Sequence, residues 1–323
     1  MRAIQIDRVG GPEVMQLVDR ELGEPGPGDV RVRHGACGVN FLDTYHRTGL
    51  YKLPLPAILG TEAAGTIEAI GAGVEHLGVG DRVAYAAKQP GSYAEARNLP
   101  ALTVVRLPAS IDFARAAAMM LKGLTVQYLL RRTRVVLRAG DQIVWHAAAG
   151  GVGLIACQWA RALGLEVIAT AGSAAKCALA LAHGATHAID YTREDVVARV
   201  MALTGGRGVP VVYDSVGKDT WERSLGCLAP LGLLVSFGNA SGAVPPISLA
   251  QLSPKSVYVQ RPTLFAYLSS REATQEMADE LFAMVASGQV RIAAPRTYAL
   301  ADAAQAHRDL EARATTGASV LLP

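Results

Sequence analysis

The six residues Ala148-Ala149-Gly150-Gly151-Val152-Gly153 are the strongest indication of how this chain folds. It follows an apolar run at 142–146 and precedes residues 152–163, whose apolar spacing is helical. A strand leading through a glycine-rich turn into a helix is typical of a dinucleotide site, where backbone amides at the helix N-terminus approach a pyrophosphate. Ala148 replaces the first glycine of the usual G-x-G-x-x-G pattern. The turn therefore predicts dinucleotide binding, with a glycine-rich packing turn as the alternative.

Strands and helices alternate from this turn onward. The predicted strands are 142–146, 166–170, 187–189, 211–215 and 233–237, and the predicted helices are 152–163, 174–183, 194–203 and 221–228. This alternation is typical of a parallel sheet covered by helices on both faces. The first hundred residues instead hold short strand-like runs separated by glycines, which favours a mainly-β domain. We expect a helix at 271–287 and a terminal strand at 319–322 to return to that first domain.

The composition excludes several classes of protein. Half of the 323 residues are hydrophobic, so the chain is not disordered. The net charge of +3 comes from interspersed charges rather than a basic stripe, which argues against a nucleic-acid partner. The four cysteines are far apart and form no C-x-x-C pair, which favours a reducing cytoplasm. No signal peptide is apparent, and the long uncharged stretches are broken by glycine or proline, so we expect a cytoplasmic protein with no membrane segment.

The end of the second predicted strand indicates which dinucleotide binds. An NAD site places a carboxylate there, on the ribose 2′-hydroxyl. This chain has Ala171, Gly172 and Ser173, and Lys176 follows one helical turn later. A hydroxyl and an ammonium favour a 2′-phosphate, so the sequence predicts NADPH. The alternative for Lys176 is an ordinary lysine on a helix surface.

Six motifs occur in an order that is familiar as a set. They are 40–45 (NFLDTY), 60–65 (GTEAAG), 121–125 (LKGLT), 146–153 (HAAAGGVG), 213–217 (YDSVG) and 236–238 (SFG). Together they resemble the zinc-independent NADPH:quinone oxidoreductases, the zeta-crystallin-like members of the medium-chain dehydrogenase/reductase superfamily. The resemblance covers essentially the whole chain. It implies an α/β protein with a doubly wound Rossmann domain at 123–260, a GroES-like mainly-β catalytic domain built from 1–122 and 261–323, and a homodimer.

The resemblance also bears on metal binding, because the superfamily has a zinc-dependent branch. In that branch a cysteine stands in place of Asn40 and a histidine in place of Thr61, and neither replacement is a good zinc ligand. Cys37 lies three positions before Asn40, and we expect it to face elsewhere. The cysteine-rich structural zinc lobe is missing, since no cysteine occurs between Cys37 and Cys157. We therefore expect no metal.

The resemblance implies two sets of site residues. The set placed near the nicotinamide and the acceptor is Asn40, Asp43, Tyr45 and Tyr51. The cofactor-binding set is Phe41, Lys122, Thr125, Gly150, Gly151, Val152, Gly172, Ser173, Lys176, Tyr191, Ser215, Phe237, Gly238, Asn239, Arg261 and Arg313. Alternatives stay open: the two tyrosines as ordinary half-buried residues, and the two arginines as members of surface ion pairs. We expect Asp43 to orient neighbours or start a helix, and His46 and His146 to be structural.

The implied activity is metal-free hydride transfer from NADPH to a quinone. A quinone is already electron-poor, and its reduced oxyanion is spread over a ring, so the reaction needs positioning and a hydrogen-bond donor more than a Lewis acid. An NADPH-dependent reductase of alkenal or enone double bonds is the first alternative. A non-catalytic crystallin-like or RNA-binding role is the second, although no basic stripe supports it.

Overall fold

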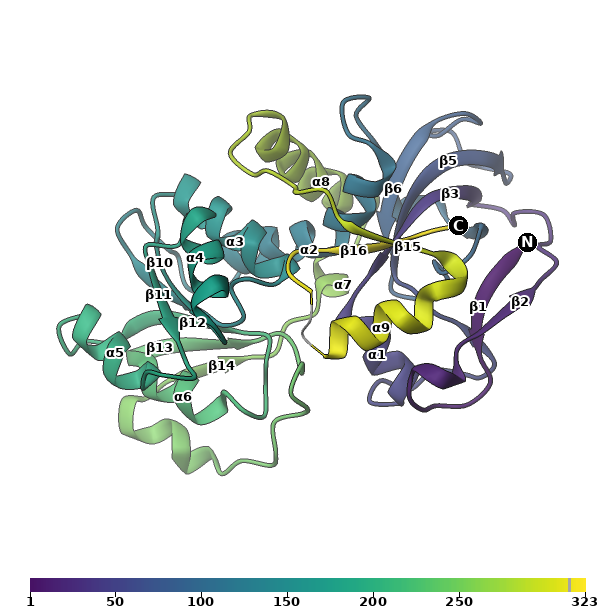
Figure 1. Ribbon diagram of the computed structural model, residues 1–323. Coiled ribbons are helices and arrows are strands. Elements are labelled where there is room, and N and C mark those ends of the chain that lie inside the picture. The colour runs from purple at the N-terminus through teal and green to yellow at the C-terminus, as the bar shows by residue number, and fades with distance from the viewer. Residues whose placement is uncertain (313–314) are drawn as a thin grey trace. The chain divides into compact units, whose positions relative to one another are not determined.

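The computed structural model describes residues 1–312 and 315–323 and divides them into two compact units (Figure 1). The first unit is built from 1–124, 267–283 and 292–323, and the second from 125–266 and 284–291. One helix, α2 (Phe113–Arg131), continues across the division. Residues 284–291 pack with the second unit, whereas the sequence-based boundaries place them in the first domain. Those domain boundaries remain a prediction.

The sheet of the second unit is entirely parallel. Its strands lie in the order β11 (His187–Asp190), β10 (Glu166–Ala171), β9 (Gln142–Trp145), β12 (Val209–Asp214), β13 (Leu228–Ser236) and β14 (Tyr258–Gln260). The chain starts in the middle at β9, moves outward to β11 and then crosses to β12. This is the doubly wound Rossmann order, and it confirms the predicted fold class. Ligands of such sheets bind at the carboxyl ends of the strands, where the strand order reverses.

Helices follow the strands of this sheet one by one. They are α3 (Gly151–Ala162), α4 (Ala174–Ala182), α5 (Val196–Leu203), α6 (Trp221–Cys227) and the 3-10 helix η3 (Leu249–Lys255). Val200 of α5 and Trp221 of α6 pack in one core cluster with Val144 and Val212 of the sheet. The central strands are mostly apolar because both of their faces are buried, which is why their sequences show no strict alternation.

The first unit is built on two antiparallel-rich sheets. The larger has β15 (Arg296–Ala299), β16 (Ser319–Leu322), β3 (Asp29–Val39), β5 (Glu62–Ile70), β6 (Arg82–Ala86) and β8 (Val104–Arg106) in that order, with β7 (Ala96–Pro100) also paired to β3. The smaller has β2 (Gln16–Asp19), β1 (Arg2–Ile6) and β4 (Ala57–Ile58). The terminal strand β16 is antiparallel to β3, so the C-terminus does return to the unit that the N-terminus begins.

The remaining helices belong mostly to the first unit, and α1 and α9 carry residues of the candidate site. They are α1 (Phe41–Thr48), α7 (Leu264–Tyr267), α8 (Arg271–Ala286) and α9 (Ala303–Glu311), with 3-10 helices η1 (Pro12–Val14), η2 (Ala101–Thr103) and η4 (Leu300–Asp302). Helix α9 lies beside α1 (Figure 1). Among the described residues, no helix combines the length and the apolar character that crossing a membrane requires.

Candidate active site

The glycine-rich turn lies where the sequence places it, between β9 and α3. Gly150 is the N-cap of α3, with an extended backbone (φ −80°, ψ 171°) and no side-chain cap for the first turn. Gly151 and Val152 open the helix, so their amides lie at the positive end of its dipole. A helix N-terminus that ends a strand–turn unit is suited to binding a phosphate group.

Gly153 explains why the turn must contain small residues. A Cβ atom at this position would lie 2.5 Å from the Cα atom of Ala148 and 2.5 Å from its carbonyl oxygen. Backbone atoms cannot yield as a flexible side chain does, so any larger residue would push α3 away from the turn. Ala148 is itself fully buried, which leaves no room for a larger side chain there either.

The residues assigned to the 2′-phosphate come together at the carboxyl ends of β10 and β11. Ser173 is the N-cap of α4, and its hydroxyl accepts a hydrogen bond from the backbone N–H of Lys176 at 3.3 Å. Gly172 faces Tyr191, since a Cβ atom on that glycine would lie 2.5 Å from the Tyr191 hydroxyl. No carboxylate stands at residues 171–173. The local chemistry is therefore a helix N-terminus with two hydroxyl side chains and a lysine in its first turn.

The residues assigned to the nicotinamide half also share one edge of the sheet. Ser215 follows β12, while Phe237, Gly238 and Asn239 follow β13. The backbone of Gly238 passes against Ser215, where a Cβ atom would overlap the serine carbonyl. Phe237 stacks at a tilt on Trp145, with ring centroids 5.8 Å apart. Thr125 lies buried on α2.

Arg261 has a structural role that its sequence position does not reveal. Its Nη1 atom donates at 3.0 Å to each of three oxygens: the carbonyl and hydroxyl oxygens of Ser236 and the carbonyl oxygen of Gly238. The guanidinium therefore holds the loop that follows β13 in place. Arg313, the other predicted arginine, lies outside the described residues.

His146 is buried and hydrogen-bonded through both ring nitrogens. Nδ1 lies 2.8 Å from the hydroxyl of Thr170, and Nε2 lies 3.1 Å from the hydroxyl of Ser224. Ser224 in turn donates to Asp214 at 2.8 Å. Burial lowers the pKa of His146, so the ring is neutral in this network. Such a fully bonded histidine fits the structural role expected of it.

The predicted acceptor-side residues belong to the first unit, at the start of α1. Asn40 is the N-cap of this helix, and its backbone N–H donates to the Asp43 carboxylate at 2.9 Å. Asp43 is the third residue of the helix, so this bond is one half of a capping box. The side-chain amide of Asn40 turns away and donates to Glu62 Oε1 at 2.8 Å. The two bonds fix both the backbone and the side chain of Asn40.

Glu62 is the centre of a buried ionic cluster. Besides Asn40, its carboxylate accepts from the Lys122 ammonium at 2.7 Å and from the backbone N–H of Leu121 at 2.7 Å. The side chains of Glu62 and Lys122 are 0% and 6% exposed. A buried carboxylate is tolerated only where a cation and hydrogen-bond donors satisfy it, and here it has both. Lys122, predicted to line the nicotinamide, thus donates a hydrogen bond from its ammonium group to the Glu62 carboxylate.

Asp43 is fully buried and accepts three hydrogen bonds. Besides the Asn40 N–H, the hydroxyl of Thr61 donates at 3.0 Å and that of Tyr93 at 2.9 Å. Burial raises the pKa of Asp43 to about 7, while these donors oppose the rise by stabilising the ionised form. Three donors thus hold the Asp43 carboxylate, an arrangement suited to the orienting role that stays a prediction for this residue.

An aromatic cluster lies along α1 and the residues after it. Tyr45 and Tyr51 meet edge to face with ring centroids 5.4 Å apart, and Phe41 lies 6.4 Å from Tyr45. His46 adjoins Tyr51 at 6.1 Å between ring centroids, and its buried Nδ1 atom has no hydrogen-bond partner among the described residues. Burial lowers the pKa of His46 to about 4, so this ring is neutral near pH 7. The cluster offers flat surfaces and hydroxyl groups.

Metal ligands are not gathered in this region. Within residues 1–312 and 315–323, no three or more His, Cys, Asp or Glu side chains are grouped so as to hold a metal ion. Cys37 is buried in the core, with its Sγ atom 3.8 Å from the carbonyl oxygen of Ala94, and burial raises its pKa to about 12. The thiolate that zinc requires is therefore disfavoured at Cys37. That the protein works without a metal remains a prediction.

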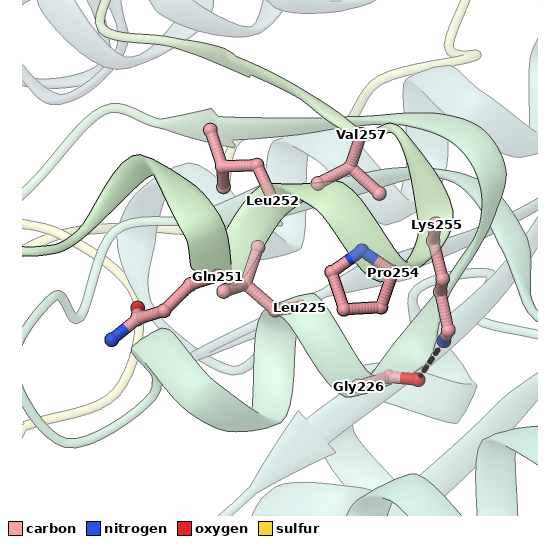
Figure 2. Close-up of a pocket in the computed structure, with 7 residues that line it drawn as sticks. All are labelled: Leu225, Gly226, Gln251, Leu252, Pro254, Lys255 and Val257. Atoms are coloured by element: carbon pink, nitrogen blue, oxygen red, sulfur yellow. Dashed lines mark hydrogen bonds between the residues drawn. The ribbon is translucent and has the colours of Figure 1, made fainter.

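A separate pocket of about 170 Å³ lies in the second unit, between α6 and η3 (Figure 2). None of the predicted site residues lines it. Its one charged side chain, Lys255, is already engaged, since its ammonium donates to the carbonyl oxygens of Gly226 at 2.8 Å and Leu228 at 2.7 Å. The pocket is also smaller than a typical ligand site, so we assign it no role.

Comparison with known proteins places this architecture in a family. Residues 26–109 match the alcohol dehydrogenase GroES-like domain, and residues 151–283 match the zinc-binding dehydrogenase domain. The quinone oxidoreductase of Pseudomonas aeruginosa is 56% identical, over 100% of this chain and 99% of that protein. A crystal structure of Escherichia coli quinone oxidoreductase complexed with NADPH has a TM-score of 0.98 and 50% identity, covering 100% of both chains. The 2-haloacrylate reductase of a Burkholderia species is 42% identical, over 99% of this chain and 98% of that protein.

The two matched domains, together with a Rossmann sheet and its glycine-rich turn, define a medium-chain dehydrogenase/reductase. Within that superfamily the chain belongs to the quinone oxidoreductases. The fold class and the family resemblance read from the sequence are thereby confirmed.

Several residues of the first-unit cluster were not among the predicted site residues. Glu62 lies inside the motif at 60–65, so that motif could have indicated it as a site residue. Tyr93 and His307 carry no local signal, because they reach Asp43 and each other across 50 and 214 positions of sequence. Only the N-cap pair Asn40 and Asp43 has the spacing of a recognisable motif.

Proposed function

We propose that this chain reduces quinones with NADPH as the reductant. The observation that carries the proposal is the full-length likeness to a structure described as a quinone oxidoreductase complexed with NADPH. The residues of this chain fit such a cofactor for two reasons. Gly153 lets α3 pack closely on the turn before it, and residues 171–173 after β10 include no carboxylate.

We assign the second unit to the cofactor. The amides of Gly151 and Val152 would bind the pyrophosphate, with Gly150 as the uncapped N-cap. Gly172, Ser173, Lys176 and Tyr191 would surround the 2′-phosphate. The nicotinamide half would lie along the predicted residues Thr125, Ser215, Phe237, Gly238 and Asn239. Arg261 would support the backbone of the loop after β13. Phe41 and Lys122, which the resemblance adds to the cofactor set, belong to the first unit, and Arg313 lies outside the described residues.

We assign the acceptor to the residues of the first unit. NADPH, when bound, supplies a hydride. Tyr45 and Tyr51 offer ring faces and hydroxyls for a flat acceptor, and Asn40 offers an amide held in place by Glu62. Asp43 holds the N-cap of α1 and does not itself touch the acceptor, since it is fully buried. Preorganised donors of this kind are what a quinone oxygen needs as it gains negative charge.

Steady-state assays test the proposal directly. With NADPH, the purified enzyme is expected to reduce 1,4-benzoquinone and 9,10-phenanthrenequinone, and to oxidise NADPH faster with them than with a short 2-alkenal. NADH is expected to support a lower kcat/KM than NADPH. Quinone rates no greater than those of an enzyme-free control would refute the assignment.

Reduction of an activated double bond is the second candidate. The observation that favours it is the 42% identity to the protein named 2-haloacrylate reductase, which covers nearly all of both chains. Including 2-chloroacrylate in the same assays separates the two candidates. A higher kcat/KM for the acrylate than for either quinone would select the double-bond reductase.

We further propose that the enzyme is a cytoplasmic homodimer joined through β14. This strand is one of the two edge strands of the Rossmann sheet, and Tyr258 and Val259 are 57% and 38% exposed there. An exposed apolar edge strand pairs readily with another strand. The four cysteines are unpaired, in keeping with a reducing compartment.

A further inference from the structure

A chain of hydrogen bonds joins the C-terminal helix α9 to Asp43 within the first unit. Glu311 binds the Arg47 guanidinium through both carboxylate oxygens, at 2.6 and 3.1 Å. Arg47 Nη1 lies 3.0 Å from His307 Nδ1, and His307 Nε2 lies 3.0 Å from the Tyr93 hydroxyl. Tyr93 then donates to Asp43 Oδ2 at 2.9 Å. The side chains between Glu311 and Asp43 are at most 1% exposed.

The direction of every bond in this chain is fixed by chemistry. A guanidinium has donors only, so His307 Nδ1 must accept from Arg47. Burial lowers the pKa of His307 to about 3, so the ring is neutral and its one proton is on Nε2. Nε2 therefore donates to the Tyr93 oxygen, which leaves the single hydroxyl proton of Tyr93 for Asp43. Through His307, the Arg47 guanidinium thus orients the Tyr93 hydroxyl as a proton donor toward the Asp43 carboxylate.

We propose that His307 and Tyr93 are positioning residues for the reduction: they orient Asp43, and through it they hold Asn40 at the start of α1. The inference rests on the proposed function, because Asn40 is assigned there to the acceptor side. His307 and Tyr93 act only through Asp43, whose carboxylate accepts the Asn40 backbone N–H at 2.9 Å. The side chain of Asn40 is held separately by Glu62, so Asp43 fixes the backbone of Asn40 and not its side chain.

The first unit contains a matched pair that makes a stringent control. The Tyr85 hydroxyl lies 2.8 Å from His34 Nε2 and donates to the Ser92 hydroxyl at 3.1 Å. Tyr85 and Tyr93 are both 0% exposed and both bond to a buried histidine. Only Tyr93 is linked to Asp43. Loss of either hydroxyl should therefore cost similar stability, whereas only the loss at Tyr93 should alter the reaction.

The first experiment compares Tyr93→Phe with Tyr85→Phe. Both variants are expected to lower the melting temperature by similar amounts. Tyr93→Phe is expected to lower kcat for quinone at least tenfold with the KM for NADPH changed less than twofold, while Tyr85→Phe leaves kcat within twofold. Equal kcat values for the two variants would overturn the proposal.

A second comparison tests His307 by conservative replacement. Glutamine offers an oxygen to Arg47 and an amide donor to Tyr93, whereas leucine offers neither. His307→Gln is expected to retain at least one-third of the wild-type kcat, and His307→Leu less than one-tenth. Equal loss of kcat in both variants would show that His307 acts through packing alone.

The pH profile supplies a readout that packing would not move. The Tyr93 hydroxyl lowers the pKa of Asp43, and its removal should raise that pKa further above 7. The acid limb of kcat/KM should then shift to higher pH in Tyr93→Phe and not in Tyr85→Phe. The other titratable or charged groups near Asp43, namely Cys37, His46, Arg47, Glu62 and His307, are retained in both variants. An unshifted limb in Tyr93→Phe would count against the proposal.

Crystal structures of the two variants separate this inference from the proposed function. Loss of the bond between the Asn40 N–H and Asp43 in Tyr93→Phe alone would support the positioning role whatever the substrate is. An unmoved Asn40 in that variant would overturn it, even if the wild-type enzyme reduces quinones. Inactivity of the wild-type enzyme toward quinones would instead refute only the proposed function.

Discussion

At the scale of single residues, we assign the choice between NADPH and NADH to the short loop that follows β10. The polar groups at this loop are the N-cap hydroxyl of Ser173, the hydroxyl of Tyr191 beside Gly172, and Lys176 in the first turn of α4. Residues 171–173 carry no carboxylate, and the carboxylate of Asp190, beside Ala171 in the sheet, accepts from the backbone N–H and the hydroxyl of Thr192. A charge placed in this turn should therefore act on NADPH and hardly at all on NADH.

Lys176→Glu is expected to weaken NADPH binding about 10- to 100-fold, since a charge-assisted hydrogen bond is worth about 1.5–3 kcal/mol. NADH binding should change less than threefold, because NADH carries no phosphate at that position. Fluorescence titration of both cofactors measures the two dissociation constants. Arg161→Glu is the control, since it makes the same charge change in the last turn of α3, at the end of that helix away from the glycine-rich turn. Equal losses for NADPH and NADH would contradict the 2′-phosphate assignment.

At the scale of elements, the packing of α3 on the turn before it sets the geometry of the proposed pyrophosphate site. A methyl group on Gly153 would meet backbone atoms of Ala148. Gly153→Ala is therefore expected to destabilise the protein by about 1–3 kcal/mol, the usual cost of overpacking. It should also weaken NADPH and NADH equally, because both have a pyrophosphate.

Thermal unfolding and titration with both cofactors test this prediction. Gly78→Ala serves as the control: no atom lies within 4 Å of the added methyl group, and the backbone has no positive φ. That variant should stay within about 1 kcal/mol of the wild type. Unchanged cofactor affinity in Gly153→Ala would show that the turn does not depend on close packing.

The elements also show what the sequence reveals and what it conceals. In the second unit most strands and helices were predicted to within about two residues, because buried parallel strands are short apolar runs bounded by helix signals, but β13 begins at Leu228, five residues before the predicted 233. The strand β14 was missed, since residues 258–260 are a short, exposed edge with no apolar run. In the first hundred residues the sequence predicted only short strand-like runs separated by glycines, and it indicated α1 only through Asp43 as a residue that could start a helix.

The candidate site divides in the same way. The glycine-rich turn and the Ser173 cap depend on neighbours in sequence, so a local pattern indicates them. The contacts of Glu62 and Arg261 depend on residues 22–60 positions away. The resemblance implied a cofactor-binding role for Arg261, which stays a prediction, and the structure adds that its guanidinium binds oxygens of Ser236 and Gly238.

At the scale of the whole molecule, the edge strand β14 makes a prediction about assembly. If two chains pair along it, a charge at Val259 repels its counterpart and is costly to bury. Val259→Lys is expected to shift the mass measured by light scattering from that of a dimer to the 33.9 kDa of one chain. Val136→Lys, which is also on an exposed position of the second unit, should remain dimeric. A wild-type enzyme that is monomeric would refute the proposed homodimer.

The position of β16 between β15 and β3 has a consequence for how the protein is made. The ribosome delivers the N-terminus first, yet β3 receives one of its neighbours only when residues 319–322 emerge. His307 and Glu311 also arrive within the last twenty residues, whereas every segment of the second unit has been synthesised by residue 291. The second unit can therefore fold before the first unit, which still lacks its C-terminal strand. A chain cut short by a late stop codon would keep its Rossmann sheet and lack the helix that orients Asp43.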